Sequence, residues 1–232
     1  MRDNPHRYGV FLRPDPRTCA VLARLHLLMK QQYGLVSCAA FPPHATLAGN
    51  VHATVAEEEL IAVLDPLLSE ATSFTTYNSG IDRHGKGFAY NVHHLPDGTP
   101  NPEMVGLAVS VNAALAPVSS IQPDFLFKPF DPAEFRAHLS VASHELTLRP
   151  DLYEEIGEFL DTLAADPPKR FTAETISLFR FHSGDWNAQW WRDMTWVHVR
   201  SWRLQGAEAT VSGRGSGPMT AWERPHEARV AP

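Results

Sequence analysis

Apolar residues alternate with polar ones over short stretches of the chain, and between these stretches they recur with helical spacing. The alternating stretches predict strands over 8–13, 44–48, 73–81, 88–94, 138–142, 171–181 and 194–204. The helical spacing predicts helices opened by Pro16 and by Pro150, and further helices over 60–68 and 102–115. Gly34 is expected to end the first helix. This mixture of strands and helices predicts an α+β fold.

The order of the expected elements repeats along the chain. Each unit has a motif strand, a helix and a hairpin, and a Phe-Thr pair precedes the hairpin at Phe74 and again at Phe171. Because order and spacing agree, we interpret the chain as a duplicated unit. We therefore expect a bilobal, pseudo-two-fold molecule with two antiparallel sheets facing a central cleft and helices on the outer faces. The domain is expected to span 1–205, with halves near 1–100 and 101–205, followed by a C-terminal tail over 206–232.

The two motif strands carry the candidate chemistry. Residues 41–48 read FPPHATLA, and an altered copy at 135–142 reads FRAHLSVA. Side chains alternate between the two faces of an extended strand, so each copy presents its histidine and its hydroxyl side by side. We expect both strands to be central in the structure and their polar groups to converge on one substrate. The candidate catalytic residues are His44, Thr46, His138 and Ser140.

A third His-x-Thr sequence, at His52 and Thr54, lies where a helix is expected to begin. Thr54 stands three residues before Glu57 and ahead of an apolar helical pattern, so we interpret it as the N-cap of a capping box. A single histidine beside a hydroxyl is more often structural than catalytic. The duplication, with a Phe three residues before each motif histidine, favours catalytic roles for His44 and His138.

Composition limits the class of partner. The chain has 232 residues, 44% of them hydrophobic, a net charge of −6 and a pI near 6.0. The acidic balance argues against charge-driven binding of duplex nucleic acid and leaves small nucleotides or RNA ends as the expected partners. The two cysteines, Cys19 and Cys38, are expected to be reduced thiols. With no apolar leader and no membrane-length apolar run, we expect a cytoplasmic protein, without a membrane partner, that acts as a monomer.

A pair of histidines suits acid and base catalysis at a phosphodiester. One imidazole can activate water while the other protonates the leaving oxygen, and neither residue is assigned to a role by the sequence. Hydroxyl groups can donate hydrogen bonds to the oxygens that gain charge. The other histidines show no spacing typical of a metal site, so we expect no metal and no cofactor. Surface or turn positions are expected for His84, His93, His94, His182 and His198.

The two motifs resemble the paired His-x-Thr/Ser-x motifs of the 2H phosphoesterase superfamily, which includes 2',5' RNA ligase-like proteins and cyclic nucleotide phosphodiesterases. The resemblance covers roughly 8–204 and implies a bilobal α+β fold and phosphoric diester hydrolysis. Residues 8–11 and 41–44 are similar to the yeast and plant cyclic phosphodiesterase branch, which implies that Phe11 lies near the base. This branch tends to carry Tyr where Ser143 stands, and that departure bears on base recognition.

Other aromatic and basic residues have both a functional and a structural interpretation. Phe181, a second candidate for contacting the substrate base, lies near the second hairpin with Trp186, Trp190 and Trp191, although large aromatics at strand ends more often pack in a core. Lys86 and Arg180 could meet a phosphate, and solvated surface charge is the commoner case.

Three functions remain open on the sequence alone. The first is a metal-independent phosphodiesterase that acts on 2',3'-cyclic or 2',5'-linked nucleotides or RNA ends. The second is a nucleotide- or RNA-binding module with the same fold and no turnover. The third is a metal hydrolase that uses the scattered histidines. Retention of all four motif side chains favours the enzyme, and the sequence does not distinguish among the phosphodiester substrates.

Overall fold

The computed structural model describes residues 6–120, 129–163, 167–186 and 189–206. The predicted tail over 206–232 therefore lies outside the described residues, apart from Gly206. Within the described ranges, no helix is long and apolar enough to cross a membrane. The described residues combine four α-helices with antiparallel strands, which confirms the predicted α+β class.

The described strands form one eight-stranded sheet and one two-stranded sheet. The order in the larger sheet is β10-β9-β1-β2-β7-β5-β4, and its eighth strand, β6, pairs with β2. The smaller sheet consists of β3 and β8. The two motif strands, β2 and β7, are neighbours in the middle of the large sheet, as expected. The strand bounds are β1 His6–Arg13, β2 Ala45–Ala53, β3 Phe74–Tyr77, β4 Ile81–His84, β5 Gly87–Asn91, β6 Ser119–Ser120, β7 His138–Ala142, β8 Arg170–Ala173, β9 Thr175–His182 and β10 Thr195–Arg203.

The helices begin and end largely where the sequence signals predict. The α-helices are α1 Pro16–Tyr33, α2 Glu57–Glu70, α3 Pro102–Leu115 and α4 Tyr153–Thr162, and short 3-10 helices cover Cys38–Ala40, Ala116–Val118, His144–Thr147, Pro150–Leu152 and Trp190–Arg192. The Asp15 side chain caps α1 by accepting from the Thr18 N–H at 2.8 Å, and Gly34 ends this helix in the left-handed conformation at φ 72°. These local contacts set both ends of α1, which begins and ends at the predicted residues.

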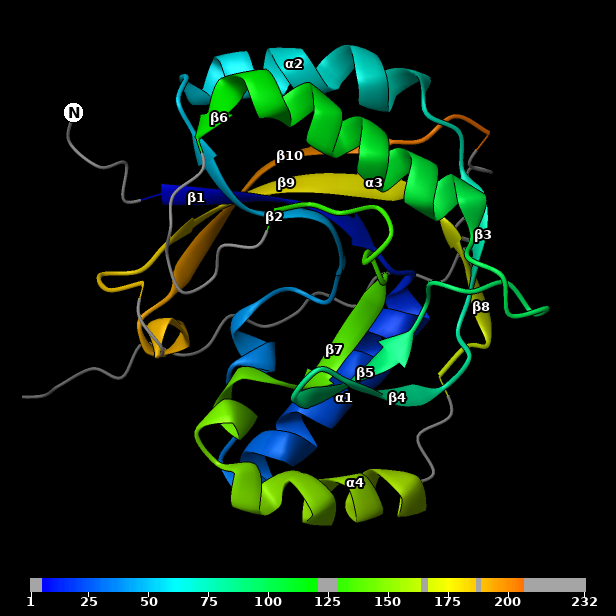
Figure 1. Cartoon of the computed structure of the whole chain (residues 1–232), viewed down its shortest axis with the longest axis vertical. Helices are drawn as coiled ribbons and strands as arrows, with labels where there is room; N and C mark the ends of the chain where they lie inside the picture. Colours follow the sequence, from blue (N-terminus) through cyan, green and yellow to red (C-terminus); the bar gives the residue numbers. More distant parts are fainter. Residues whose placement is uncertain (1–5, 121–128, 164–166, 187–188, 207–232) are drawn as a thin grey trace, which may run out of the picture.

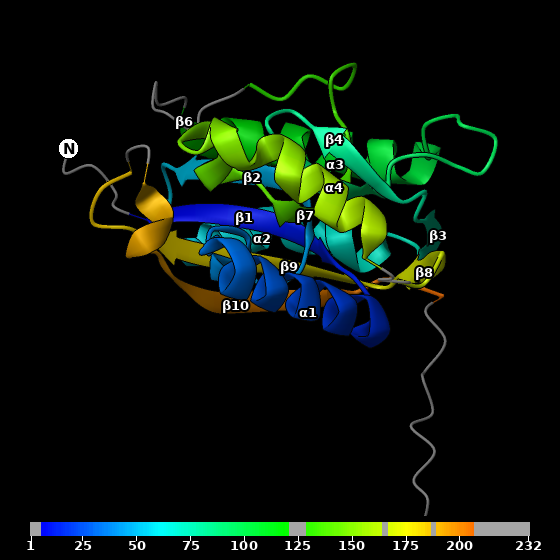
Figure 2. The same cartoon turned by 90° about the horizontal axis from the view of Figure 1, so that it is seen from below.

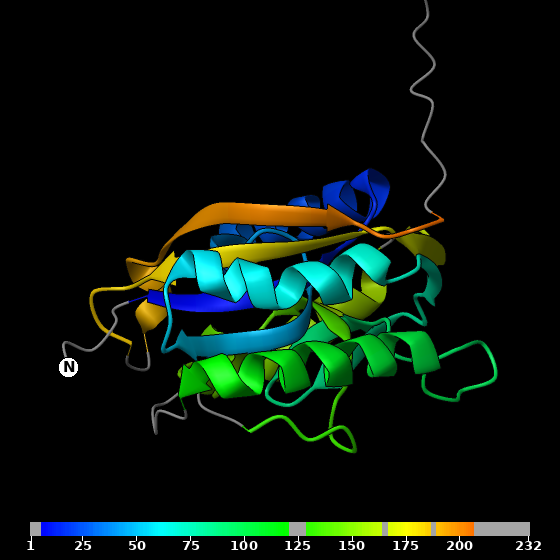
Figure 3. The same cartoon turned by 90° about the horizontal axis from the view of Figure 1, so that it is seen from above.

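Two pairs of helices lie on opposite sides of the strands. Helices α2 and α3 contact each other and lie against β10 and β2, respectively, on the side seen from above (Figures 1 and 3). Helix α1 packs against β7, and it lies with α4 on the other side, seen from below (Figure 2). Buried leucines on α1 and α2 fill the core between helices and strands, among them Leu22, Leu25, Leu60, Leu64 and Leu68. Each motif strand thus has one helix packed against it, α3 on β2 and α1 on β7.

The predicted repeat of elements is present in the structure. The order strand, helix, short strand and hairpin occurs as β2-α2-β3-β4-β5 and again as β7-α4-β8-β9-β10. The two short strands pair with each other, with Phe74 opposite Ala173 and Thr76 opposite Phe171. The first hairpin joins β7 through β5, and the second joins β1 through β9. Each hairpin therefore extends the sheet beside a strand of the other half, and a pseudo-two-fold division near residue 100 stays a prediction.

Two local predictions were wrong. Thr54 is not the N-cap of α2, because the cap is Ala56, without a side-chain hydrogen bond. Strand β2 continues to Ala53, and the Thr54 N–H donates to the Val118 carbonyl, so tertiary pairing overrides the capping signal. The strand expected over 73–81 is split, because 74–77 pairs with β8 and only 81–84 enters the hairpin with β5.

Candidate active site

The register between β2 and β7 brings the two motifs together. Ala45 pairs with Leu139, and these are the residues that follow the two motif histidines. In antiparallel strands, one step in either direction sets His44 beside Ser140 and Thr46 beside His138. Opposite residues have Cβ atoms about 5 Å apart. All four side chains also line one cavity, so each histidine has the hydroxyl of the other motif as its cross-strand neighbour.

The two histidine rings are held in the same way. His44 Nδ1 lies 2.7 Å from the Pro42 carbonyl oxygen, and His138 Nδ1 lies 2.8 Å from the Arg136 carbonyl oxygen, in both cases two residues earlier. A carbonyl oxygen only accepts, so both Nδ1 atoms carry the proton. In the neutral rings Nε2 is then the atom with a free lone pair. The motifs therefore present two equivalent imidazoles in the same tautomer.

Burial holds both imidazoles neutral. It lowers the pKa of His44 to about 4, opposed by the hydrogen bond to the Pro42 carbonyl and aided by nearby His138. It also lowers the pKa of His138 to about 4, with a smaller contribution from His84. Desolvation of a charged ring is the principal cause in both cases. If catalysis needs one imidazolium, one of these two imidazoles must therefore take up a proton when an anionic ligand enters the cavity.

An aromatic ring stacks on each motif histidine. The Phe11 ring lies over His44 with centroids 3.8 Å apart, and the His84 ring lies over His138 with centroids 3.9 Å apart. Phe11 folds back over its own strand, where a Cβ on Gly9 would approach its Cζ to 2.5 Å. Glycine at this position therefore leaves the space that Phe11 occupies beneath the imidazole.

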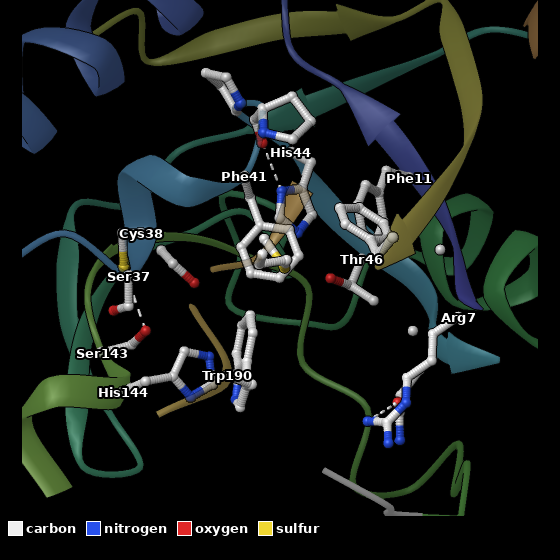
Figure 4. Close-up of a pocket in the computed structure, with 18 of the residues that line it drawn as sticks. Arg7, Phe11, Ser37, Cys38, Phe41, His44, Thr46, Ser143, His144 and Trp190 are labelled. Carbon is white, nitrogen blue, oxygen red and sulfur yellow. Dashed lines mark hydrogen bonds between the residues drawn. The ribbon is translucent and has the colours of Figure 1, made fainter. Parts of the chain in front are cut away.

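The cavity has a volume of about 380 Å³ and lies between strands β1, β2 and β7 and the 3-10 helices Cys38–Ala40, His144–Thr147 and Trp190–Arg192. Arg7 is the only Arg or Lys among the described residues that line it, and no Asp or Glu is among them. Figure 4 shows His44 beside Phe11, with Thr46 between His44 and Arg7 in this view. The permanent charge of the lining is thus positive, and it favours an anionic ligand.

The motif hydroxyls are available to a ligand. Neither the Thr46 nor the Ser140 side chain makes a hydrogen bond to another described residue, and both line the cavity. The Ser140 carbonyl is occupied separately, because His26 Nε2 donates to it at 2.8 Å. Two unused hydroxyl donors beside two imidazoles form a site that can bind phosphoryl oxygens and move protons near them.

A hydrogen-bonded group supports the far wall of the cavity. The Glu145 carboxylate accepts from the Val36 and Ser37 N–H groups, each at 2.6 Å, and from the Ser37 hydroxyl. Cys38 Sγ lies 3.2 Å from the Ser143 hydroxyl. Burial raises the pKa of the Cys38 thiol to about 12, so this cysteine is not a thiolate nucleophile at neutral pH. These contacts hold Ser143 in place. The yeast and plant cyclic phosphodiesterase branch tends to carry Tyr at this position.

The two residues predicted to contact the base, Phe11 and Phe181, both line the cavity but are only 3% and 4% exposed. They pack in a small aromatic cluster, and His44 covers one face of Phe11. Their roles in binding a base stay predictions. Trp190 and Trp191 are buried, as the structural interpretation expected, while Trp186 is half-buried at the cavity.

Several expectations about histidine and basic residues need correction. His93 is 2% exposed rather than on the surface, and burial lowers its pKa to about 4. His84 stacks on His138, so it belongs to the site. Arg180 pairs with Glu57 at 2.9 Å. Among the described residues, no three His, Cys, Asp or Glu side chains are grouped so that they could hold a metal ion.

Sequence reasoning missed Arg7 and His144 as cavity residues, and it missed His84 as the ring that stacks on His138. His144 is half-buried, lines the cavity and contacts the Trp190 ring with centroids 4.9 Å apart. A usable signal existed for Arg7, because it stands two and four residues before Gly9 and Phe11 on one face of the first strand. The expected strand began at Tyr8 and so excluded it. No spacing in the sequence connects His84 or His144 to the motifs.

No family model matches the chain, and no curated protein matches it. Solved structures with a similar chain path include LigT of E. coli complexed with 3'-AMP, with 14% identity, coverage of 87% of this chain and 99% of that chain, and a TM-score of 0.45. TT0787 of Thermus thermophilus has 15% identity, coverage of 87% and 99%, and a TM-score of 0.48. Usb1 of Kluyveromyces marxianus has 12% identity, coverage of 84% and 97%, and a TM-score of 0.39. At these values the similarity carries no inference about activity.

Proposed function

We propose that this protein is a metal-independent phosphodiesterase that hydrolyses 2',3'-cyclic or 2',5'-linked nucleotides or RNA ends. The observation that carries the proposal is the Ala45–Leu139 pair, which sets each motif histidine beside the hydroxyl of the other motif. The shared Nδ1 contacts, which hold both motif histidines in the same tautomer, support it. The resemblance of both motifs to 2H phosphoesterases points to the same reaction class.

In the proposed reaction, one neutral imidazole takes a proton from water as the water oxygen bonds to phosphorus. The other imidazole, protonated, gives its proton to the ribose oxygen as the phosphorus–oxygen bond breaks. Thr46 and Ser140 donate hydrogen bonds to the non-bridging oxygens, which gain negative charge in the transition state. The product is a phosphomonoester with a free ribose hydroxyl, and the two histidines end with their protonation states exchanged.

A phosphodiester anion also supplies the negative charge that an imidazolium in this cavity needs. With pKa values of about 4, both imidazoles are neutral at pH 7, and the negative phosphate stabilises a proton on one of them. The substrate therefore assembles the mixed protonation state on binding. The apparent pKa values of the active complex belong to the coupled pair rather than to single residues.

The test is turnover of a panel of 2',3'-cyclic and 2',5'-linked nucleotides in excess chelator. We expect His44→Ala and His138→Ala each to lose about 100-fold to 10,000-fold in kcat. The double variant should lose less than the product of the two factors, because the residues act as one unit. His52→Ala, in the His-x-Thr sequence outside the cavity, is the matched control and should keep its activity.

Two outcomes would contradict the proposal. Activity that disappears in chelator and returns with zinc or manganese would replace the mechanism with metal catalysis. A folded wild-type protein that binds nucleotides without turning over any of the panel would favour the binding module.

A further inference from the structure

The far end of the cavity contains a buried cation. Arg7 lines the cavity, and only 6% of its surface is exposed. Its guanidinium lies 4.0 Å from the centroid of the Trp186 ring, and Nη1 donates to Asn50 Oδ1 at 2.9 Å. Burying a guanidinium removes much of its hydration, so the group gains strongly from an anion that can reach it. Arg7 thus offers an anionic ligand a partly desolvated positive charge in the cavity wall.

The local backbone holds Arg7 in place. Asn50, its hydrogen-bond partner, has φ of 52° and is the only non-glycine residue with positive φ in the described part of the chain. This conformation is uncommon outside glycine, and it turns β2 where the Arg7 side chain meets it. The flat face of Trp186 fixes the guanidinium plane from another direction. Arg7 is therefore a preorganised group at the cavity, unlike a mobile surface cation.

Arg7 lies apart from the catalytic groups. Arg7, Gly9 and Phe11 occupy every second position of β1 and so share one face of the strand. Thr46 lies opposite Phe11 in the neighbouring strand. Arg7 and Phe11 are four positions apart on this strand, or about 13 Å between their Cα atoms. The Arg7 side chain also points away from His44 and Thr46 into the other end of the pocket (Figure 4). Arg7 therefore lies further along the same cavity than Phe11, the residue that stacks on His44.

We propose that Arg7 binds a second phosphate of the substrate, next to the one that is hydrolysed. This inference rests on the proposed function, and it narrows the substrate to nucleotides that carry a further phosphate beyond the reacting diester. That phosphate has two possible sources, the 5'-phosphate of the same nucleotide and the internucleotide phosphate of an RNA end. Arg7 forms the specificity subsite, and the motif residues perform the reaction.

Binding of inert product-like ligands tests this assignment without turnover. Adenosine 3'-monophosphate, adenosine 3',5'-bisphosphate and a diadenosine dinucleotide with a 3'-phosphate are titrated by calorimetry at several salt concentrations. We expect the wild type to bind one or both of the ligands with a second phosphate about 10-fold or more tightly than the monophosphate. Its salt slope should be steeper by about 0.7 for that extra contact. The bisphosphate and the dinucleotide distinguish the two sources.

Arg7→Gln should remove the preference and leave binding of the monophosphate within about twofold. Arg203→Gln is the matched control, because Arg203 is an exposed arginine that pairs with Glu174, and it should keep the preference. Equal wild-type affinity and salt slope for the three ligands would overturn the assignment, as would an equal loss for all three in Arg7→Gln. If Arg7→Gln does not fold, the wild-type ligand series decides alone.

The failure of this inference is separable from failure of the proposed function. Turnover of a nucleoside 2',3'-cyclic phosphate without any preference for a second phosphate keeps the function and rejects the subsite. A second-phosphate preference in a protein that turns over nothing keeps the subsite and rejects the phosphodiesterase.

Discussion

A methyl group added at Gly9 is the most informative perturbation of this site. In Gly9→Ala the new Cβ would meet Phe11 Cζ at 2.5 Å and Cε1 at 2.6 Å. Carbon atoms normally approach to about 3.5 Å, so the ring must move by about 1 Å. Phe11 is 3% exposed and surrounded by Phe41, Phe179 and Phe181, which prevents it from rotating freely into solvent.

The displaced ring is the one that stacks on His44 at 3.8 Å. A shift of about 1 Å in a catalytic group can cost on the order of 100-fold in rate, and we expect a loss of this size in kcat. Overpacking of the aromatic cluster should also lower the free energy of unfolding by about 1–3 kcal/mol. Turnover of a cyclic nucleotide and urea unfolding, measured on the same preparation, separate these two effects.

Gly106→Ala provides the matched control, because a Cβ at this position of α3 has no neighbour within 4 Å. It should leave kcat unchanged and raise the free energy of unfolding by up to about 1 kcal/mol. Adding Phe11→Leu to Gly9→Ala should restore stability and leave kcat low, because the clash is relieved while the stacked ring is lost. A folded Gly9→Ala protein with wild-type kcat would refute the idea that Phe11 positions His44.

Further predictions concern the hydroxyls and the titration of the histidines. Thr46→Val and Ser140→Ala should each raise the activation barrier by about a few kcal/mol with the fold intact. Thr54→Val, outside the cavity, should leave kcat unchanged, and equal losses of kcat at Thr46 and Thr54 would contradict the assignment. The pKa values of His44 and His138 are about 4 in the folded protein and 6.5 in the unfolded chain, so both rings bind more protons after unfolding. The free energy of unfolding should therefore fall as the pH drops from 6.5 to 4, by up to about 1.4 kcal/mol per pH unit for each ring. Urea titrations should show this loss shrinking in His44→Asn and His138→Asn, and an unchanged slope would refute the depressed pKa values. Binding of adenosine 3'-monophosphate at pH 7 should be accompanied by uptake of a proton from the buffer. Calorimetry in two buffers of different ionisation enthalpy measures this uptake, and zero uptake would show that neither ring gains a proton when the anion binds.

The sequence predicted the parts of this protein that depend on local periodicity. Helix α3 has the predicted bounds Pro102–Leu115, α1 begins at Pro16 and ends before Gly34, and both motif strands lie where alternation placed them. Caps, turns and side-chain alternation are properties of neighbouring residues, so a single sequence is enough to reveal them. The duplicated order of elements followed from the same local signals.

The composition of the cavity was decided by tertiary pairing. The register of Ala45 with Leu139 joins residues far apart in the chain, and no local pattern specifies which residue pairs with which. The same holds for His84, which reaches His138 only because the first hairpin pairs with β7. Thr54 shows the converse, since a valid capping pattern lost to the extension of β2.

The motifs thus supplied the imidazoles and hydroxyls, and the long-range packing supplied the surroundings that set their properties. Burial of His44 and His138, which lowers both pKa values, comes from strands and helices brought together across the whole chain. Arg7 became part of the cavity because β1 lies between β2 and β9. Desolvation and charge depend on everything within several ångströms in space, whereas a sequence records only what is adjacent along the chain.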